Sequence, residues 1–179
     1  MPLSVVFTQM IVLMAGLPGA GKSTLARELA SRTGGSVLGK DEIRAAIFAP
    51  EDIEFSTAQD DFVVEVMLQA ASFLVKTNPS RLIFLDGRTF SQSYQIDRVF
   101  EFAGELAQPC RIVECVCSDE SARRRLELDA QGGHPAANRT FELYLEVKAR
   151  FQPITRDKTV VSTERPLAEC IEQALAGIS

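Results

Sequence analysis

A glycine-rich turn between two strongly patterned segments constrains this chain more than any other feature of its sequence. Residues 9–15 (QMIVLMA) form an apolar run that ends directly at Gly16. A short apolar run bounded in this way is typical of a strand buried on both faces of a sheet. Helix-forming residues follow from Thr24 and stop at Gly34, where glycine commonly ends a helix. The sequence therefore predicts a buried strand, a glycine loop and a helix in immediate succession.

The loop, residues 16–23 (GLPGAGKS), matches the phosphate-binding pattern G-x-x-x-x-G-K-[ST] at every fixed position. Its glycines let successive backbone N–H groups turn toward a phosphate, and the N-terminus of the following helix adds partial positive charge. Lys22 is expected to reach the β- and γ-phosphates, and Ser23 to offer its hydroxyl to Mg²⁺. The strand–loop–helix context disfavours the alternative, a glycine turn that only redirects the chain.

This pattern makes ATP, together with Mg²⁺, the expected ligand. Lys22 would also take part in catalysis, because its charge can follow the transferred phosphoryl group. The residues expected to contact the nucleotide are Gly16, Leu17, Pro18, Gly19, Ala20, Gly21, Lys22, Ser23 and Thr24.

Strand and helix patterns alternate along the rest of the chain. Further strands are predicted at 37–38, 81–86, 111–117 and 159–162, and helices from Glu42 and over 57–77, 92–107, 120–129, 141–151 and 166–176. Such alternation indicates one α/β domain over residues 1–179, with an open parallel sheet and helices on both faces. In the long helix 57–77, we expect the apolar face to carry Phe62, Val66, Ala70 and Phe73, which recur at helical spacing.

Composition narrows the function classes. The 19 basic and 24 acidic residues give a net charge of −5, whereas a protein that grips long nucleic acid usually carries an excess of Lys and Arg. The apolar stretch 10–15 is too short to span a bilayer, and no basic segment precedes it. We therefore expect a small-molecule substrate, no membrane anchor and a cytoplasmic location, with residues 1–8 as a loose extension. The oligomeric state is left open.

The cysteines do not form a metal-binding pattern. No C-x-x-C pair is present, and His134 is the single histidine, whereas a structural zinc site needs four Cys or His ligands at short spacings. We expect buried free thiols, which suits a reducing compartment. The four cysteines are Cys110, Cys115, Cys117 and Cys170.

Two carboxylates follow predicted strands, at the sheet edge where α/β proteins bind ligands. Asp41 follows the second strand in residues 40–44 (KDEIR), and Asp86 closes the third in residues 85–89 (LDGRT). Both are candidates for accepting a proton or holding Mg²⁺. Arg44, one helical turn after Asp41, and Arg88 are candidate substrate-binding residues, as is Asp86. The alternatives are a helix cap for Asp41 and a turn residue for Asp86.

A further set of arginines lies near a predicted loop at 131–139. Arg123, Arg124 and Arg125 are consecutive, so only one or two of them can share a helix face. The loop itself carries two glycines and Arg139, which is typical of a lid that closes over phosphates. The alternative is a solvated charge cluster. We expect His134 to have a structural role in the loop.

Three motifs together resemble the P-loop predicted-kinase family, which is related to polynucleotide 5′-kinases, chloramphenicol phosphotransferase and zeta toxins. They are residues 16–24 (GLPGAGKST), 40–44 (KDEIR) and 85–90 (LDGRTF), and the resemblance extends from Met10 to about Phe151. It implies a nucleotide-kinase-like three-layer fold, five parallel strands in the order 2-3-1-4-5, a small lid, and phosphoryl transfer from ATP to a hydroxyl.

The resemblance also implies roles for individual residues. Lys22 and Ser23 would bind the triphosphate and Mg²⁺, with Asp41 as the base and Arg125 as a lid arginine. Relatives often carry a second lid arginine four residues after the first, but this chain has Asp129 there. Either Arg139 takes over that role or the lid works differently. The candidate metal ligands are Ser23, Asp41 and Asp86, and the candidate catalytic residues are Lys22, Asp41, Arg125 and Arg139.

Three functions are compatible with these residues. The leading hypothesis is a kinase for a small hydroxyl compound, whose pocket would be lined by residues 44–55 and 88–95. A polynucleotide 5′-hydroxyl kinase is the second hypothesis, disfavoured by the net charge. A nucleotide-dependent regulatory ATPase is the third, and it would need a segment that orders on the γ-phosphate. The sequence does not identify the acceptor.

Overall fold

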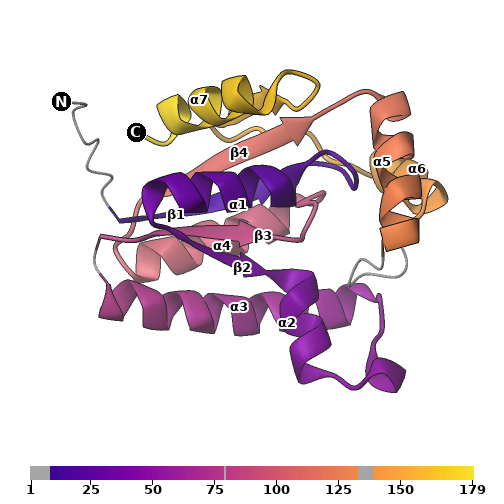
Figure 1. Cartoon of the computed structure of the whole chain (residues 1–179). Helices are drawn as coiled ribbons and strands as arrows, with labels where there is room; N and C mark the ends of the chain where they lie inside the picture. Colours follow the sequence, from indigo (N-terminus) through magenta and orange to yellow (C-terminus); the bar gives the residue numbers. More distant parts are fainter. Residues whose placement is uncertain (1–8, 79, 133–138) are drawn as a thin grey trace.

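A parallel sheet of five strands forms the centre of the molecule, in the order β2-β3-β1-β4-β5 (Figure 1). The computed structural model describes residues 9–78, 80–132 and 139–179. In the central strand, Leu13 lies between Leu85 of one neighbour and Ile112 of the other. The predicted fold class and strand order are confirmed. The strands are β1 (Met10–Ala15), β2 (Ser36–Gly39), β3 (Leu82–Asp86), β4 (Cys110–Val116) and β5 (Thr159–Ser162).

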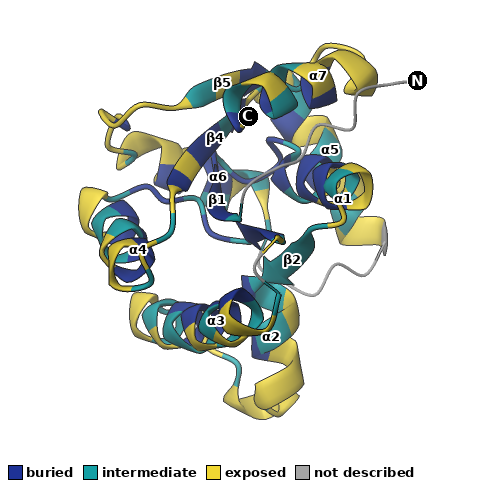
Figure 2. Ribbon diagram, turned by 90° about the vertical axis from the view of Figure 1, so that its left-hand side faces the viewer, coloured by how far each residue is buried: buried dark blue, intermediate teal, exposed yellow. Residues whose placement is uncertain are grey.

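Helices cover both faces of the sheet, as the alternating pattern predicted. Helices α1 (Lys22–Thr33) and α7 (Leu167–Gly177) lie on one face, and α3 (Thr57–Thr77) and α4 (Ser93–Glu105) on the other (Figures 1 and 2). The remaining elements gather at the carboxyl edge of the sheet (Figure 1). They are α2 (Lys40–Ile47), the 3₁₀ helix η1 (Pro50–Asp52), α5 (Asp119–Gly132) and α6 (Phe141–Ala149).

The central strand divides the apolar core into two layers, because successive side chains of a strand point to opposite faces. Ile11 and Leu13 pack into the cluster under α3 and α4, whereas Val12 and Met14 pack into the cluster under α1 and α7. All six residues of β1 are buried. The strand is thereby fixed in the centre, and the loop that follows it emerges at a defined point of the sheet edge.

The predicted apolar face of α3 is wrong. Phe62 is 54% exposed and Phe73 is 67% exposed. The side that meets the sheet instead carries Val63, Val64, Met67, Leu68, Ala71 and Val75. Apolar residues occur around most of this helix, so their spacing revealed the helical period but could not select the buried face.

Several element ends also differ from the prediction. Helix α2 begins at Lys40 with Gly39 as its N-cap, so Asp41 lies in the first turn and is not the cap. The helix ends at Ile47, and Pro50 starts the separate turn η1, because proline is favoured in the first turn of a helix. Helix α5 continues to Gly132, past the predicted loop start. The expectations for residues 1–8 and for His134 lie outside the described residues.

All four cysteines are free thiols, as predicted. Cys110, Cys115 and Cys170 are buried, whereas Cys117 is only half-buried. Burial raises the pKa of the Cys110 and Cys115 thiols to about 12, so both behave as small apolar side chains at neutral pH. In the parts of the chain that the structure describes, no helix is long and apolar enough to cross a membrane.

Gly16 provides a test of the loop geometry. Its φ is +131°, and an added Cβ would lie 2.3 Å from the carbonyl oxygen of Cys115. Because strain and a backbone clash coincide, Gly16→Ala is expected to lower the free energy of unfolding by about 2–4 kcal/mol. Gly104→Ala in α4 is the control, since the described residues leave open space there. It should be neutral or stabilise by up to about 1 kcal/mol. Equal urea midpoints for the two variants would contradict this geometry.

Candidate active site

The loop after β1 is shaped by three glycines with left-handed backbone angles. Their φ values are +131° at Gly16, +75° at Gly19 and +83° at Gly21, a region that side chains with a Cβ rarely occupy. Gly21 is also the N-cap of α1, and the N–H of Gly16 donates to the carbonyl of Thr89 after β3. The loop therefore curls over the N-terminus of α1, which is the arrangement that binds phosphate in P-loops.

Lys22 lies inside this curl with only 8% of its surface exposed. Its Nζ donates to the carbonyl oxygens of Gly16 at 2.8 Å and Leu17 at 2.9 Å. Burial lowers the pKa of Lys22 from 10.5 to about 8; the Asp86 charge opposes the shift, and Arg139 adds to it. A desolvated ammonium gains strongly from an added anion, so the loop is prepared for phosphate.

Two cavities meet at Lys22 and Ser23. The α3-side cavity has a volume of about 450 Å³ and is bounded by α2, α3 and the end of β3. The α7-side cavity has a volume of about 410 Å³ and lies between α1, α5 and the loop before α7. Arg139 lines both. A ligand in one cavity can therefore meet a ligand in the other at the phosphate-binding loop.

The structure brings the two predicted carboxylates to the same cavity. Asp86, Asp41 and Ser23 all line the α3-side cavity. Asp86 is 3% exposed, and its Oδ1 has no hydrogen-bond partner among the described residues. Oδ1 of Asp41 accepts from Nη1 of Arg44 at 3.0 Å and lies 3.6 Å from Nζ of Lys40. One carboxylate is thus oriented by cations, while the other has an oxygen available for a ligand.

Lys40 and Asp60 also belong to the charged network around Asp41 and Arg44, and the sequence analysis assigned neither of them to the site. Oδ1 of Asp60 on α3 accepts from Nζ of Lys40 at 2.7 Å and also binds Nη2 of Arg44. The ring of Phe55 lies over the Arg44 guanidinium at 5.3 Å. An acidic residue in the first turn of a helix usually serves the helix dipole, so Asp60 carried no separate signal. The network fixes α2 against α3.

Arg88 is buried in the same cavity wall, with 4% of its surface exposed. Its Nη2 lies 2.6 Å from Oδ1 of Asp61 and 3.4 Å from the hydroxyl of Tyr94. The amide of Gln95 donates to the same hydroxyl at 3.4 Å. Of the predicted substrate residues, Arg44, Asp86 and Arg88 thus all line one cavity. Tyr94 and Gln95 belong to the segment 88–95 that was expected to line the acceptor pocket, whereas Asp61 was not predicted.

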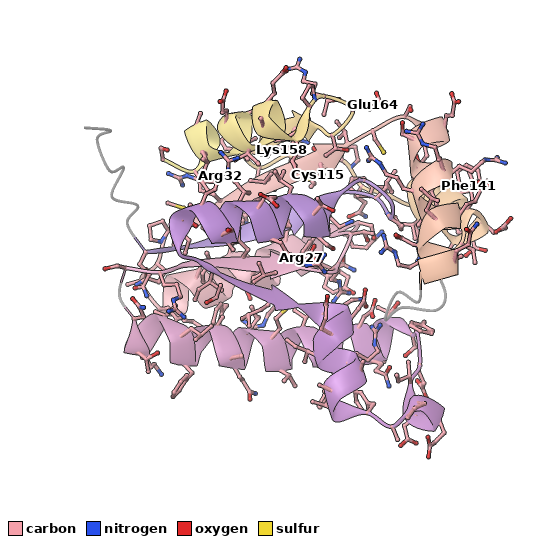
Figure 3. The ribbon with its side chains drawn as sticks, in the orientation of Figure 1. Arg27, Arg32, Cys115, Phe141, Lys158 and Glu164 are labelled. Atoms are coloured by element: carbon pink, nitrogen blue, oxygen red, sulfur yellow. The ribbon has the colours of Figure 1, made fainter. Side chains whose placement is uncertain are left out.

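Helices α5 and α6 lie at the carboxyl edge of the sheet, where the sequence predicts a lid, and we refer to this pair of helices as the lid (Figure 1). Of the three consecutive arginines, Arg123 and Arg124 are exposed and Arg125 is half-buried. Arg123 packs over the ring of Phe141, which Figure 3 labels on the lid, at 4.0 Å from the ring centre. The inward direction of Arg125 agrees with the prediction that these arginines cannot share one face.

The Arg125 guanidinium joins three elements. It donates to the carbonyl of Gly19 at 3.1 Å, and to the hydroxyl and carbonyl of Thr163 at 2.9 and 2.8 Å. Glu164, labelled in Figure 3 on the loop before α7, accepts hydrogen bonds from Ser118 and Ser121 of the α5 N-terminus. The lid, the phosphate-binding loop and the loop before α7 are therefore held together by direct bonds.

Asp129, the residue that departs from the family pattern, pairs with Arg139. Oδ2 of Asp129 lies 3.1 Å from Nη1 of Arg139. Arg139 also approaches Lys22 closely enough to lower its pKa. The carboxylate at position 129 therefore holds an arginine from the far side of the predicted loop beside the phosphate-binding loop.

The residues present fit a Mg²⁺ ion whose coordination shell is completed by phosphate oxygens and water. The described parts of the chain contain no group of three or more His, Cys, Asp or Glu side chains that could hold a metal alone. The buried Oδ1 of Asp86 and the hydroxyl of Ser23 are hard oxygen ligands lining one cavity. Mg²⁺ bound to a nucleotide normally takes only one or two protein ligands, because phosphates and water supply the others.

Comparison with known proteins agrees with this geometry. The profile of a family described as "AAA domain" matches residues 11–154. This chain belongs to that family. The match spans the phosphate-binding loop, both carboxylates and the lid, and it fits the P-loop kinase resemblance predicted from the sequence. No curated protein sequence matches the chain significantly.

Solved structures share the fold over nearly the whole chain. The APS kinase CysC of Mycobacterium tuberculosis, in complex with AMPPNP and APS, has a TM-score of 0.69 at 17% identity, over 96% of its own chain and 94% of this one. A gluconokinase from Sinorhizobium meliloti gives 0.65 at 20% identity, over 92% of its chain and 96% of this one. Chaetomium thermophilum Kti12, in complex with ADP-AlF₃, has a TM-score of 0.65 at 15% identity, over 99% of its chain and 94% of this one. The fold is that of P-loop kinases.

The lowered pKa of Lys22 gives a pH prediction. Bound phosphate stabilises the ammonium form, so ADP binding should take up a proton near pH 8–9, and ADP affinity should fall as pH rises above about 8. The contribution of Lys22 to folding stability has the opposite pH dependence. Between pH 8 and 10.5 the unfolded chain binds more protons at this residue than the folded chain, so its contribution to stability rises with pH.

Calorimetry in buffers of different ionisation enthalpy measures this proton uptake directly. Lys22→Met keeps the side-chain length without the charge, so it should bind ADP weakly and without the proton uptake of the wild type. If Lys22→Met takes up as many protons as the wild type, the titrating group is not Lys22.

Proposed function

We propose that this protein is an ATP-dependent kinase that transfers the γ-phosphoryl group to a hydroxyl of a small molecule. The observation that carries the proposal is the meeting of two cavities at Lys22 and Ser23. A protein that only binds or hydrolyses ATP needs one of them. A kinase needs both, with the acceptor hydroxyl beside the γ-phosphate. The folds shared with an APS kinase and a gluconokinase support this assignment.

The nucleotide would occupy the α7-side cavity, with its phosphates in the curl of the glycine loop. Lys22 would exchange its two carbonyl contacts for phosphate oxygens, which are better partners for a buried ammonium. Arg125 and Thr163 line this cavity and fix the carbonyl side of the loop. The backbone N–H groups are thereby directed at the phosphates before the ligand arrives, which lowers the reorganisation that the reaction requires.

The acceptor would occupy the α3-side cavity, where Asp41 serves as general base. Its carboxylate takes the proton of the acceptor hydroxyl as that oxygen bonds to the γ-phosphorus. The bond from the γ-phosphorus to the β–γ bridging oxygen breaks, and ADP leaves with the electron pair. Arg44 holds the Asp41 carboxylate through one oxygen, so the carboxylate is oriented for the transfer.

Asp86 and Ser23 would hold Mg²⁺, with Asp41 as a further candidate ligand. When bound, the ion neutralises charge on the phosphates. Asp86 fits this assignment because its Oδ1 is buried without a partner in the described part of the chain, which is costly unless a ligand satisfies it.

A regulatory ATPase is the second candidate, favoured by the similarity of fold to Kti12 bound to ADP-AlF₃. In such a protein, the α3-side cavity would have no small-molecule ligand. A polynucleotide kinase is supported less, because the chain carries a net charge of −5 and nucleic-acid binding depends on cationic surface.

ADP release separates the three functions. The protein is incubated with Mg²⁺–ATP and a panel of sugars, sugar acids, sugar phosphates, nucleosides and oligonucleotides, and ADP is measured with a coupled assay. A small-molecule kinase shows acceptor-dependent ADP release and a phosphorylated product by mass spectrometry. Stimulation by oligonucleotides alone would support the polynucleotide kinase. ADP release that no acceptor stimulates would support the ATPase.

Substitutions of the two carboxylates test their separate roles. Asp41→Asn is expected to lower turnover by about 10²–10⁴-fold with near-normal ATP binding, because an amide cannot accept the proton. Asp86→Asn is expected to raise the Mg²⁺ concentration needed for half-maximal activity. Asp52→Asn, on the exposed turn η1, is the control and should be silent. Normal turnover by Asp41→Asn together with an inactive Asp86→Asn would reverse the assignment.

The lid arginines give another prediction. Arg139→Ala should lower turnover strongly and change ATP affinity little, because a charge that acts mainly in the transition state affects the rate. Asp129→Asn should have a smaller effect of the same kind, because it releases Arg139 from its 3.1 Å contact. Arg125→Ala should also weaken ADP binding, since it loses the bonds to Gly19 and Thr163.

Arg124→Ala, at an exposed position, is the matched control on the same helix. A silent Arg139→Ala combined with an inactive Arg124→Ala would show that the roles lie on the other helix face. Turnover and ATP affinity are measured separately, by steady-state kinetics and by calorimetry.

A further inference from the structure

The wall of the α3-side cavity carries more positive than negative charge. Six of its lining side chains are basic, namely Lys22, Lys40, Arg44, Arg88, Arg139 and Arg150. Four are acidic, namely Asp41, Glu42, Asp60 and Asp86. Lys22 and Arg139 serve the nucleotide phosphates in the proposed function, so the other four cations are equal in number to the four carboxylates. Two of the arginines are almost fully buried, and a buried charge is costly unless it is paired.

The carboxylates of the cavity wall pair mostly with the cations of α2. Asp41 and Asp60 both bind Arg44, and Asp60 also binds Lys40. Glu42 pairs with Arg27 at the exposed surface. The α2 side of the cavity is therefore close to electrically balanced.

Arg88 differs from Arg44 in binding one carboxylate instead of two. It forms an ion pair through Nη2 with Asp61, whose side chain is 45% exposed. Its Nε is buried and, like the Nε of Arg44, has no hydrogen-bond partner within the described residues. A guanidinium has five N–H donors in a planar fork that matches an oxyanion. Arg88 therefore has unused donor capacity at the wall of the α3-side cavity.

A neighbouring arginine, on α4, shows what a purely structural pair with α3 looks like. Arg98 of α4 binds Glu65, four residues after Asp61 on α3, through Nε at 2.7 Å and Nη2 at 2.8 Å. This fork-to-carboxylate geometry uses the Nε of Arg98. Arg88 is more deeply buried than Arg98, whose side chain is 35% exposed, yet it leaves its Nε unpaired.

The polar groups beside Arg88 are also weakly engaged. The hydroxyl of Tyr94 lies 3.4 Å from Nη2 of Arg88, 3.4 Å from the Gln95 amide and 3.3 Å from Asp61. Hydrogen bonds of this length are weak, so a ligand can replace them at little cost. Tyr94 and Gln95 line the cavity together with Arg88.

From these contacts we infer that the acceptor carries an oxyanion, a carboxylate or a phosphate, in addition to its reacting hydroxyl, and that Arg88 binds this oxyanion. Tyr94 and Gln95 supply further donors at the same subsite. The inference rests on the proposed kinase function and specifies the substrate class of that site. Bidentate recognition of an oxyanion by a buried arginine favours the charged ligand over its neutral analogue by about 10- to 100-fold.

The experiment uses acceptors matched in carbon chain: neutral sugars and polyols, the corresponding sugar acids, and the corresponding sugar phosphates. The value of kcat/KM is measured for the wild type, Arg88→Gln and the control Arg98→Gln. The wild type and Arg98→Gln should prefer an anionic series by about 10- to 100-fold, and Arg88→Gln should lose that preference mainly through a higher KM. The acid and phosphate series show which oxyanion the subsite takes.

Two further variants keep the test decisive. Arg88→Lys retains the positive charge but lacks the planar set of guanidinium donors, so it should keep part of the preference for anionic acceptors. This variant remains informative even if Arg88→Gln folds poorly. Asp61→Asn removes the carboxylate that competes for Arg88, so KM for the anionic acceptor should fall or stay unchanged. If Arg88 served only to bind Asp61, then Asp61→Asn and Arg88→Gln would lose similar thermal stability, and neither would alter selectivity.

Failure of this inference is distinguishable from failure of the proposed function. Neutral sugars phosphorylated as well as their acids by the wild type would overturn the oxyanion subsite while the kinase assignment stands. An anion preference that survives in Arg88→Gln would also overturn it. ADP release that responds to no acceptor of either charge would overturn the kinase assignment, and the inference with it.

Discussion

The phosphate-binding loop can leave β1 only because its first residue has no side chain. A Cβ at Gly16 would lie 2.3 Å from the carbonyl oxygen of Cys115, so the loop and β4 approach as closely as two backbones can. β1 itself is fixed by burial on both faces. The loop therefore starts from a rigid point, and its curl encloses Lys22 away from solvent. Burial within this curl lowers the pKa of Lys22, and both cavities are lined by Lys22 and Ser23 at the end of the loop.

The residues that the sequence could predict are those whose role follows from local order. The glycine loop is a contiguous pattern, and its strand and helix lie directly beside it. Asp41 and Asp86 were found because the carboxyl ends of parallel strands meet at one edge of a sheet. The strand order came from the family resemblance, and the pairing of β1 with both β3 and β4 confirms it.

The residues that the sequence could not predict depend on contacts between distant elements. Asp60 and Asp61 look like ordinary surface acids of a helix, and only the packing of α3 brings them to Arg44 and Arg88. The buried face of α3 was assigned wrongly because its apolar residues nearly encircle the helix. Likewise, the partner of Asp129 became clear only when the lid placed Arg139 beside it.

The hydroxyl of Thr163 has a consequence for how the molecule opens. It accepts from Arg125 at 2.9 Å and can donate to the carbonyls of Ala20 at 3.0 Å and Val116 at 3.3 Å. One hydroxyl thus joins the lid, the phosphate-binding loop and the end of β4. Segments that share such a junction open together rather than one at a time. Backbone amides of these three segments should therefore show a common free energy of opening in hydrogen exchange, as a single cooperative unit.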